Sequence, residues 1–255
     1  MNKCLVYGNW KMNKNKEQAE ALLNQIVRGV ERCSGVEVGV FPPFVYLEKA
    51  VMIAGNSAVS VGAQNVYYQD RGAYTGEISA VMLRSIGCSH VLVGHSERRM
   101  QFHEHHASIN KKLKASLKHG LRPVLCVGES LEEKSQARSF EVLNTQLVYA
   151  LEGIEGSQVQ NVIIAYEPVW AIGTGVSAAG EQADSVHRFI KQTIKGFTGQ
   201  DTAWSIPVIY GGSVTAKNAV EFLGQKDIDG VLVGGASLQA HSFCGIALAA
   251  SSMYS

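Results

Sequence analysis

Short runs of apolar, often β-branched residues alternate along this chain with longer amphipathic stretches. Most of these runs do not alternate apolar with polar residues, which is typical of strands that are covered on both faces in a parallel sheet. Eight strands are predicted in this way, at residues 5–7, 36–40, 59–63, 91–93, 123–127, 162–165, 207–210 and 230–233. The pattern therefore favours an α/β protein.

Apolar residues at helical spacing predict helices between these strands. They lie at residues 18–30, 44–54, 109–117 and 183–194. Ser130 and Glu133 match a capping box that begins another helix. Thr215 stands where an N-cap is expected for a helix over residues 219–223.

The number and even spacing of the predicted strands indicate a closed barrel. Strands three, four and five end near Gln64, His95 and Gly128, and each interval suits one strand–helix unit. Eight such units in 255 residues match a (β/α)8 barrel, the TIM-barrel architecture, with an open doubly wound sheet as the alternative. No linker or charge block divides the chain, so we expect residues 1–255 to form a single catalytic domain.

Composition excludes several classes of protein. The 23 basic and 22 acidic residues give a net charge of +1, so no overall field favours nucleic acids or membrane surfaces. The five cysteines are scattered without a Cys-x-x-Cys pair, which indicates neither a disulfide framework nor a zinc module. No apolar run is long enough for a membrane span or a signal peptide, so we expect a cytoplasmic protein.

Polar residues and glycines cluster directly after the predicted strands. The clusters lie at residues 8–11, 64–65, 94–98, 128–129, 167, 211–213 and 234–235. In barrels of this kind the active site lies at the C-terminal ends of the strands. Clusters that are far apart in the sequence are therefore expected to meet in space.

Glu167 is the most informative of these residues. It ends the sixth predicted strand, and Pro168 biases its backbone toward extended angles. An apolar stretch with Gly173 and Gly175 follows, which suits a hinged flap over residues 168–176. A random glutamate is usually exposed. A placed carboxylate beside a flap instead predicts a general base in a closable pocket.

Two other strand ends supply groups that can act with this base. His95 precedes residues 96–99, which can begin a short helix, and a helix N-terminus favours a neutral imidazole that donates a hydrogen bond. Lys11 and Asn9 follow the first strand and offer an ammonium and an amide to a developing oxyanion. Taken alone, His95 could equally be a core histidine, and Lys11 would be interpreted as a solvated lysine. Because both are expected on the same barrel face as Glu167, catalytic roles are favoured.

Two glycine pairs follow the seventh and eighth strands, Gly211–Gly212 before Ser213 and Gly234–Gly235. Barrels build phosphate sites at these positions from backbone N–H groups, because the absence of side chains lets an anion approach. One pair alone would be explained as well by a tight turn. Two pairs at successive strand ends predict a phosphate site.

Other reactive residues have simpler explanations. Residues 103–106 contain three histidines, but their spacing fits no single helix face, so a solvated helix start is favoured over a metal site. Cys126 ends the fifth strand and is expected to be a buried packing residue, because no base is paired with it.

Taken together, these segments resemble the triosephosphate isomerase family from one end of the chain to the other. The matching motifs lie at residues 8–13, 72–79, 93–99, 126–129, 166–175, 210–214 and 229–238. The resemblance implies interconversion of dihydroxyacetone phosphate and D-glyceraldehyde 3-phosphate without a metal or organic cofactor. It assigns Glu167 as the base that moves the proton and His95 as the group that polarises the carbonyl.

The resemblance also assigns the remaining residues. Lys11, helped by Asn9, stabilises the enediolate, and the phosphate is held by Gly173, Ser213, Gly234 and Gly235. Ser96, Glu97 and Cys126 support these groups. Family members are usually homodimers, so residues 64–77 are expected to contact a partner through Gln64 and Thr75.

The chain departs from the family pattern at Val176–Ser177 and Gly180, near the end of the flap, which puts flap motion in question. Two alternatives remain. One is another barrel enzyme that acts on a phosphorylated metabolite, such as a Schiff-base aldolase or an epimerase. The other is a barrel kept as a binding protein without turnover.

Overall fold

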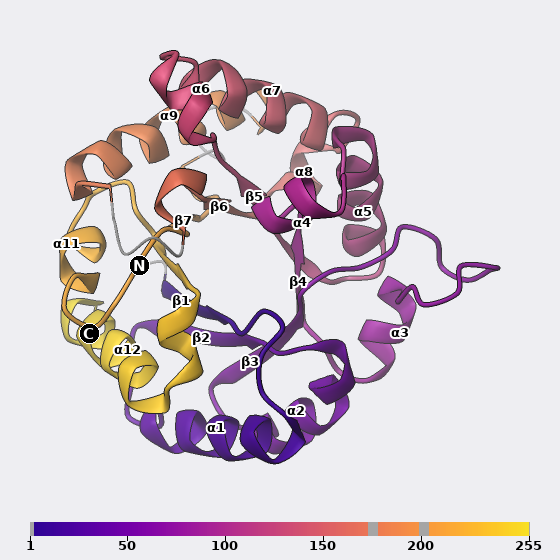
Figure 1. The fold of residues 1–255 in the computed structure, drawn as a ribbon, viewed down its shortest axis with the longest axis vertical. Coiled ribbons are helices and arrows are strands. Elements are labelled where there is room, and N and C mark those ends of the chain that lie inside the picture. The colour runs from indigo at the N-terminus through magenta and orange to yellow at the C-terminus, as the bar shows by residue number, and fades with distance from the viewer. Residues whose placement is uncertain (1–2, 173–177, 199–203, 255) are drawn as a thin grey trace.

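The computed structural model describes residues 3–172, 178–198 and 204–254. Within them, eight parallel strands form a barrel in chain order, and β8 pairs with β1 to close it (Figure 1). The strands are β1 (Cys4–Asn9), β2 (Val36–Phe41), β3 (Val59–Ala63), β4 (His90–Val93), β5 (Arg122–Val127), β6 (Ile163–Tyr166), β7 (Val208–Tyr210) and β8 (Gly230–Val233). The predicted barrel and its strands are confirmed, with each boundary within two residues of the observed one.

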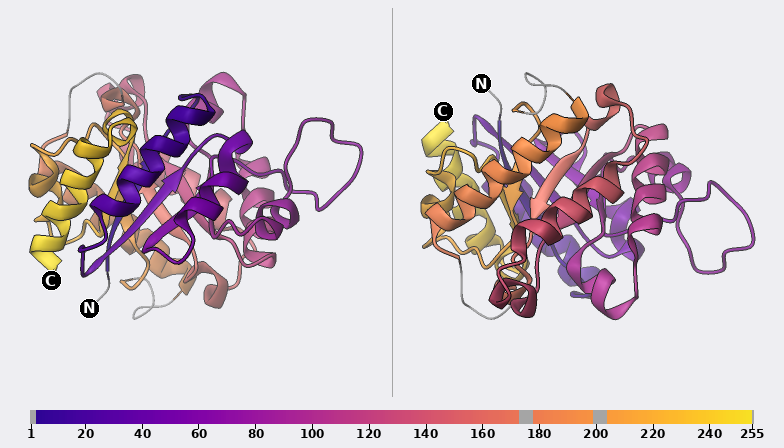
Figure 2. Two further views of the ribbon diagram at one scale, coloured as in Figure 1. Left: turned by 90° about the horizontal axis from the view of Figure 1, so that it is seen from below. Right: turned by 90° about the horizontal axis from the view of Figure 1, so that it is seen from above.

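Helices surround the barrel on its outside (Figures 1 and 2). The α-helices are α1 (Lys16–Gly29), α2 (Leu47–Ala54), α3 (Ala80–Ser85), α4 (Ser96–Gln101), α5 (His106–Lys118), α6 (Leu131–Ser135), α7 (Ser139–Leu151), α8 (Gly156–Val159), α9 (Gly180–Thr198), α11 (Ala219–Leu223) and α12 (Ala240–Tyr254). Three short 3-10 helices are η1 (Phe44–Tyr46), η2 (Val169–Ala171) and η3 (Gly235–Leu238). None of the helices described has the length and apolarity that crossing a membrane requires.

One of the two predicted helix caps is confirmed. The N–H of Glu133 donates to Oγ of Ser130 over 3.2 Å, and the N–H of Ser130 donates to the Glu133 carboxylate over 2.7 Å. The prediction for Thr215 was wrong, because the residue before α11 is Asn218. The Thr215 hydroxyl instead donates to Oδ1 of Asn218 over 3.1 Å, within the turn that precedes the helix.

Apolar residues fill both faces of the barrel wall, which explains the unbroken apolar runs of the strands. Val6 and Val38 pack outward against the helices, whereas their neighbours Leu5 and Tyr7 belong to a separate cluster. That cluster, contributed by seven of the strands, contains Leu5, Tyr7, Phe41, Leu92, Val124, Cys126, Ile163, Ala165, Ile209 and Leu232. The barrel is therefore a packed core whose upper end supports the polar strand ends.

A polar network lies near the N-terminal end of the barrel. The buried Tyr7 hydroxyl donates to Oε1 of Glu37 over 2.5 Å, and Nε2 of His90 lies 3.3 Å from the same oxygen. Arg122 donates to Oε2 of Glu37 over 3.3 Å. These contacts satisfy a carboxylate that would otherwise be costly to place partly inside the core.

One loop projects far from the barrel, between β3 and α3 (Figure 2). Its base is closed by a hydrogen bond of 2.7 Å from the Tyr67 N–H to the Ile78 carbonyl. The rings of Tyr67 and Tyr68 stack with centroids 4.3 Å apart, and Tyr74 lies 4.8 Å from Tyr67. Thr75 is exposed in this loop.

Candidate active site

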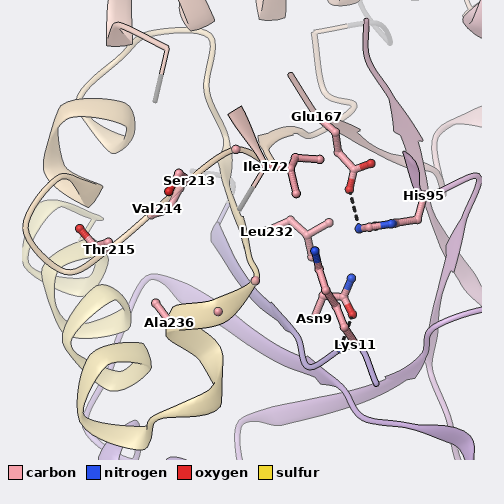
Figure 3. Close-up of a pocket in the computed structure, with 14 residues that line it drawn as sticks. Asn9, Lys11, His95, Glu167, Ile172, Ser213, Val214, Thr215, Leu232 and Ala236 are labelled. Atoms are coloured by element: carbon pink, nitrogen blue, oxygen red, sulfur yellow. Dashed lines mark hydrogen bonds and ion pairs between the residues drawn. The ribbon is translucent and has the colours of Figure 1, made fainter. Parts of the chain in front are cut away.

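A pocket of about 220 Å³ opens at the C-terminal ends of the strands. Glu167 and His95 lie on one side of it and Ser213 on the other, with Asn9 and Lys11 between them (Figure 3). The lining residues are Asn9, Lys11, His95, Glu167, Ile172, Gly211, Gly212, Ser213, Val214, Thr215, Leu232, Gly234, Gly235 and Ala236. The structure thus brings together the predicted site residues of five strand ends.

The carboxylate of Glu167 is 2% exposed and bonded at both oxygens. Oε1 lies 3.1 Å from Nε2 of His95. Oε2 accepts a hydrogen bond of 3.0 Å from the backbone N–H of Ser96. Two donors thus hold this buried carboxylate and fix its orientation, which suits a base.

His95 occupies the N-cap of α4, as the sequence predicted for a histidine at a helix start. Its Nδ1 accepts a hydrogen bond of 3.2 Å from the N–H of Glu97. Because Nδ1 accepts, the single proton of a neutral imidazole is on Nε2, which faces Glu167 and the pocket. The local fold therefore fixes both the tautomer and the direction of this donor.

Lys11 lies in a turn that its neighbours hold in an uncommon conformation. Its φ is 52°, in the left-handed region that non-glycine residues rarely adopt. Oδ1 of Asn9 accepts from the Lys11 N–H over 3.0 Å, and Nε2 of Gln64 donates to the Lys11 carbonyl over 2.8 Å. Nζ of Lys11 donates to the Glu97 carboxylate over 2.6 Å. These bonds offset a local strain of about 1–2 kcal/mol.

The glycines that line the pocket differ in what surrounds them. A Cβ on Gly211 would come within 2.9 Å of Cγ of Glu167, and one on Gly212 within 2.2 Å of the Tyr210 hydroxyl. These two positions have no room for a side chain. A Cβ on Gly235 would meet no atom within 4 Å, so its backbone, at the start of η3, is open to a ligand. An anion can approach there closely.

The remaining predicted residues fall in three places. Cys126 is fully buried in the barrel interior, where burial and then the charge of Glu167 raise the pKa of its thiol well above the ordinary value. Thr75 is exposed in the projecting loop and does not line the pocket. Gly173 and Val176–Ser177 lie outside the described residues, and Gly180 begins α9.

Two of the three histidines at residues 103–106 make other contacts. Within residues 3–172, 178–198 and 204–254, no group of three or more metal-ligating side chains is close enough to hold an ion. His106 instead stacks on Tyr149 at 5.3 Å between ring centroids, and Nδ1 of His105 accepts from the Ser108 N–H over 3.2 Å.

Sequence reasoning missed residues that the structure places beside Glu167. Ile172 and Leu232 line the pocket with apolar surface. Oε1 of Glu129 accepts from the Trp170 indole over 2.9 Å and from the Tyr166 hydroxyl over 3.1 Å, which anchors the start of the flap. The strand-end position of Glu129 was the only signal, and it does not reveal partners so distant in sequence.

Comparison with known proteins agrees with this geometry. A sequence model described as "Triosephosphate isomerase" matches residues 4–250. A protein named triosephosphate isomerase from Alkaliphilus oremlandii is 46% identical over 246 residues, which cover 96% of this chain and 99% of that protein. Its namesake from Moorella thermoacetica is 45% identical and covers 96% and 98% of the two chains. This chain belongs to the triosephosphate isomerase family.

Proposed function

We propose that this chain interconverts dihydroxyacetone phosphate and D-glyceraldehyde 3-phosphate by proton transfer through an enediolate, as an isomerase of glycolysis and gluconeogenesis. Membership of the family supports the reaction. One observation supports the mechanism: a buried carboxylate on Glu167 and the Nε2 donor of His95, 3.1 Å apart, face one end of a pocket whose other end is open backbone. A proton acceptor and a carbonyl-polarising donor thus lie at the same end.

In the proposed reaction, Glu167 removes a proton from the carbon beside the substrate carbonyl. The C–H electron pair forms a carbon–carbon double bond, and the carbonyl π electrons move to oxygen. Nε2–H of His95 donates to that oxygen as its negative charge develops. Glu167 then returns the proton to the neighbouring carbon, while His95 assists proton exchange between the two oxygens.

Lys11 supplies a fixed positive charge to the enediolate. Its ammonium is held by Glu97 over 2.6 Å, and the side chain is mostly buried, with 27% of it accessible. Asn9, which is 5% exposed, restrains the same turn and adds a polar side chain to the pocket wall. Because these groups are positioned before the substrate arrives, little reorganisation is needed as charge develops.

The phosphate is proposed to bind opposite the base. Gly234, Gly235 and Ser213 line that end of the pocket. Backbone N–H groups at the start of a helical turn favour an anion. Gly173 is proposed to add an N–H from the flap, and Ile172 and Leu232 to exclude water from the enediolate.

We also propose that the chain forms a homodimer through residues 64–77, with Gln64 and Thr75 at the contact. The loop projects from the barrel (Figure 2), and residues 71–77 in it are exposed. Met12 and Val45, which are 95% and 81% exposed, are large apolar side chains of the kind found at interfaces.

The molecular mass in solution tests the proposed homodimer. A species near twice 27.5 kDa is expected, and Thr75→Arg should reduce the fraction of protein in that species. A monomer for the unmodified chain would contradict it.

Two further proposals concern the location of the protein and its domain organisation. The balanced charge and the glycolytic reaction support a cytoplasmic location. Residues 1–255 are proposed to act as one catalytic domain, because the pocket takes residues from β1, β4, β6, β7 and β8 and their following loops.

A direct assay tests the reaction. Purified protein is mixed with D-glyceraldehyde 3-phosphate and a metal chelator, and dihydroxyacetone phosphate is measured with a coupling enzyme that tolerates the chelator. Rapid conversion is expected, and Glu167→Gln is expected to lose it. Folded protein without conversion would contradict the proposal and favour a binding role.

The Schiff-base aldolase is tested separately by borohydride trapping. A Schiff base requires a free amine nitrogen, and Nζ of Lys11 is engaged by the Glu97 carboxylate at 2.6 Å. We therefore expect no covalent adduct on Lys11 after reduction with substrate present. An adduct there would overturn the isomerase assignment.

A further inference from the structure

Strand β4 ends before its neighbour β5. The last pair between them joins Val93 to Leu125, whereas β5 continues to Val127 along β6. In a parallel sheet, alternate residues bond to the strand on either side. Beyond Leu125, the backbone groups of Cys126 and Gly128 that face the β4 side therefore need partners from elsewhere.

Two side chains take the place of the missing strand. Arg99 donates to the Cys126 carbonyl over 3.0 Å and to the Gly94 carbonyl, just past β4, over 2.7 Å. Gln146, on α7, bonds to both backbone groups of Gly128. Its Oε1 accepts from the Gly128 N–H over 2.8 Å, and its Nε2 donates to the Gly128 carbonyl over 3.0 Å. The Gln146 carboxamide thus makes the two hydrogen bonds that the backbone of a neighbouring strand would make.

The opposite edge of the same segment holds the backbone of Glu167. The N–H of Glu167 donates to the Val127 carbonyl over 2.7 Å, and the N–H of Val169 donates to the Glu129 carbonyl over 3.1 Å. Gly128 lies between these two bonds. A Cβ on it would come within 1.7 Å of the Glu167 carbonyl oxygen, so the two backbones are in direct contact.

From this arrangement we propose that Gln146 is a positioning residue for Glu167, acting through the Gly128 peptide. The proposal rests on the proposed role of Glu167 as the base. Gln146 is 8% exposed and does not line the active-site pocket, so any effect it has on the reaction must pass through other residues. It lines instead a second cavity, of about 240 Å³, that lies behind Glu167. A shift of the Gly128 peptide into that space would carry the base away from the substrate.

The chemistry of the contact explains why the residue is a glutamine. Both a donor and an acceptor are needed on one side chain, and a carboxamide has both. Glutamate has the same length, but its ionised carboxylate cannot donate to the Gly128 carbonyl and would repel it. Methionine has a similar length and provides neither strong bond.

The first test compares Gln146→Met and Gln146→Glu with Leu147→Ala. Leu147 is a fully buried neighbour on α7, so its truncation weakens the helix packing without removing a bond to Gly128. Both Gln146 variants are expected to lower kcat about tenfold with KM changed by less than about twofold, because a small misplacement of a catalytic group is costly. Leu147→Ala should lower the unfolding temperature and keep kcat. Wild-type kcat in both folded Gln146 variants would overturn the proposal.

A double-mutant cycle separates this proposal from the role of the base. In Glu167→Asp the carboxylate is already retracted, so adding Gln146→Met should cost much less than it costs in the wild-type chain. Independent effects that multiply would mean that Gln146 affects turnover by a route other than Glu167, and would overturn the proposal while Glu167 remained the base. Full turnover of the Glu167→Asp single variant would instead remove the base assignment itself.

Discussion

Nε2 of His95 lies 3.1 Å from Oε1 of Glu167, so the donor that we propose for the substrate carbonyl is engaged by the carboxylate. The other oxygen of Glu167 accepts from the Ser96 N–H over 3.0 Å. A substrate must therefore replace Glu167 as the acceptor of the His95 proton. In the proposed reaction the carboxylate must leave both donors to reach the carbon.

Glu167→Asp should lower kcat by about 100-fold, because it retains the carboxylate and moves it back by about 1 Å. Steady-state kinetics in both directions measure the effect. Glu155→Asp, on an exposed residue at the start of α8, is the matched control and should leave kcat unchanged. Unchanged turnover in Glu167→Asp would remove this residue as the base.

His95→Gln should lower kcat more than it weakens substrate binding. In the proposed mechanism the imidazole donor acts on charge that develops in the transition state, whereas the phosphate binds at the other end of the pocket. The comparison is between kcat and the inhibition constant of an unreactive phosphate analogue. A loss confined to affinity would argue against the proposed role of His95.

The polar strand ends were predictable because the barrel places every C-terminal end on one face. The positions of Lys11 and His95 could be predicted from the apolar run before each of them. A polar or charged side chain is costly inside a buried strand, so it is expected at the strand end. The capping box of Ser130 could also be read, because its two bonds are local. These features depend on short stretches of sequence.

Other features could not be read because they depend on partners far along the chain. Gln146 is 18 residues from Gly128, and nothing local shows that its amide faces that peptide. Helix α12 was not predicted, since its apolar residues are not confined to one stripe, and it packs against α1, α11 and β1. Thr215 is a residue type that often caps helices, but its hydroxyl donates a hydrogen bond to Oδ1 of Asn218 instead.

Gly128→Ala should reduce activity by one to two orders of magnitude, about the cost of a misplaced catalytic group. The new methyl group would lie 1.7 Å from the Glu167 carbonyl oxygen, a distance that forces the two backbones apart. The matched control is Gly196→Ala, since a Cβ there would meet no atom within 4 Å. Normal kcat in a folded Gly128→Ala protein would show that the base tolerates displacement of its backbone.

The Glu37 carboxylate should make the fold sensitive to acid. Burial alone would raise its pKa, but hydrogen bonds from His90 and Tyr7 and the charge of Arg122 outweigh burial and lower the pKa from 4.5 to about 2. A depressed pKa in the folded state contributes stability that is fully present above pH 4.5 and is lost as the pH falls toward 2. The shift corresponds to roughly 3 kcal/mol.

Glu37→Gln isolates this contribution. Urea unfolding of the wild-type chain and the variant at several pH values between about 3 and 7 gives the difference in their free energies of unfolding. That difference should be largest at neutral pH and shrink as the pH falls below about 4.5, where the wild-type chain begins to take up a proton on unfolding. Isomerase activity at pH 7 should persist in the folded variant, because Glu37 lies near the start of β2, at the end of the barrel away from the pocket. A difference that stays constant with pH would mean that the network of Tyr7 and His90 does not hold Glu37 in its charged form.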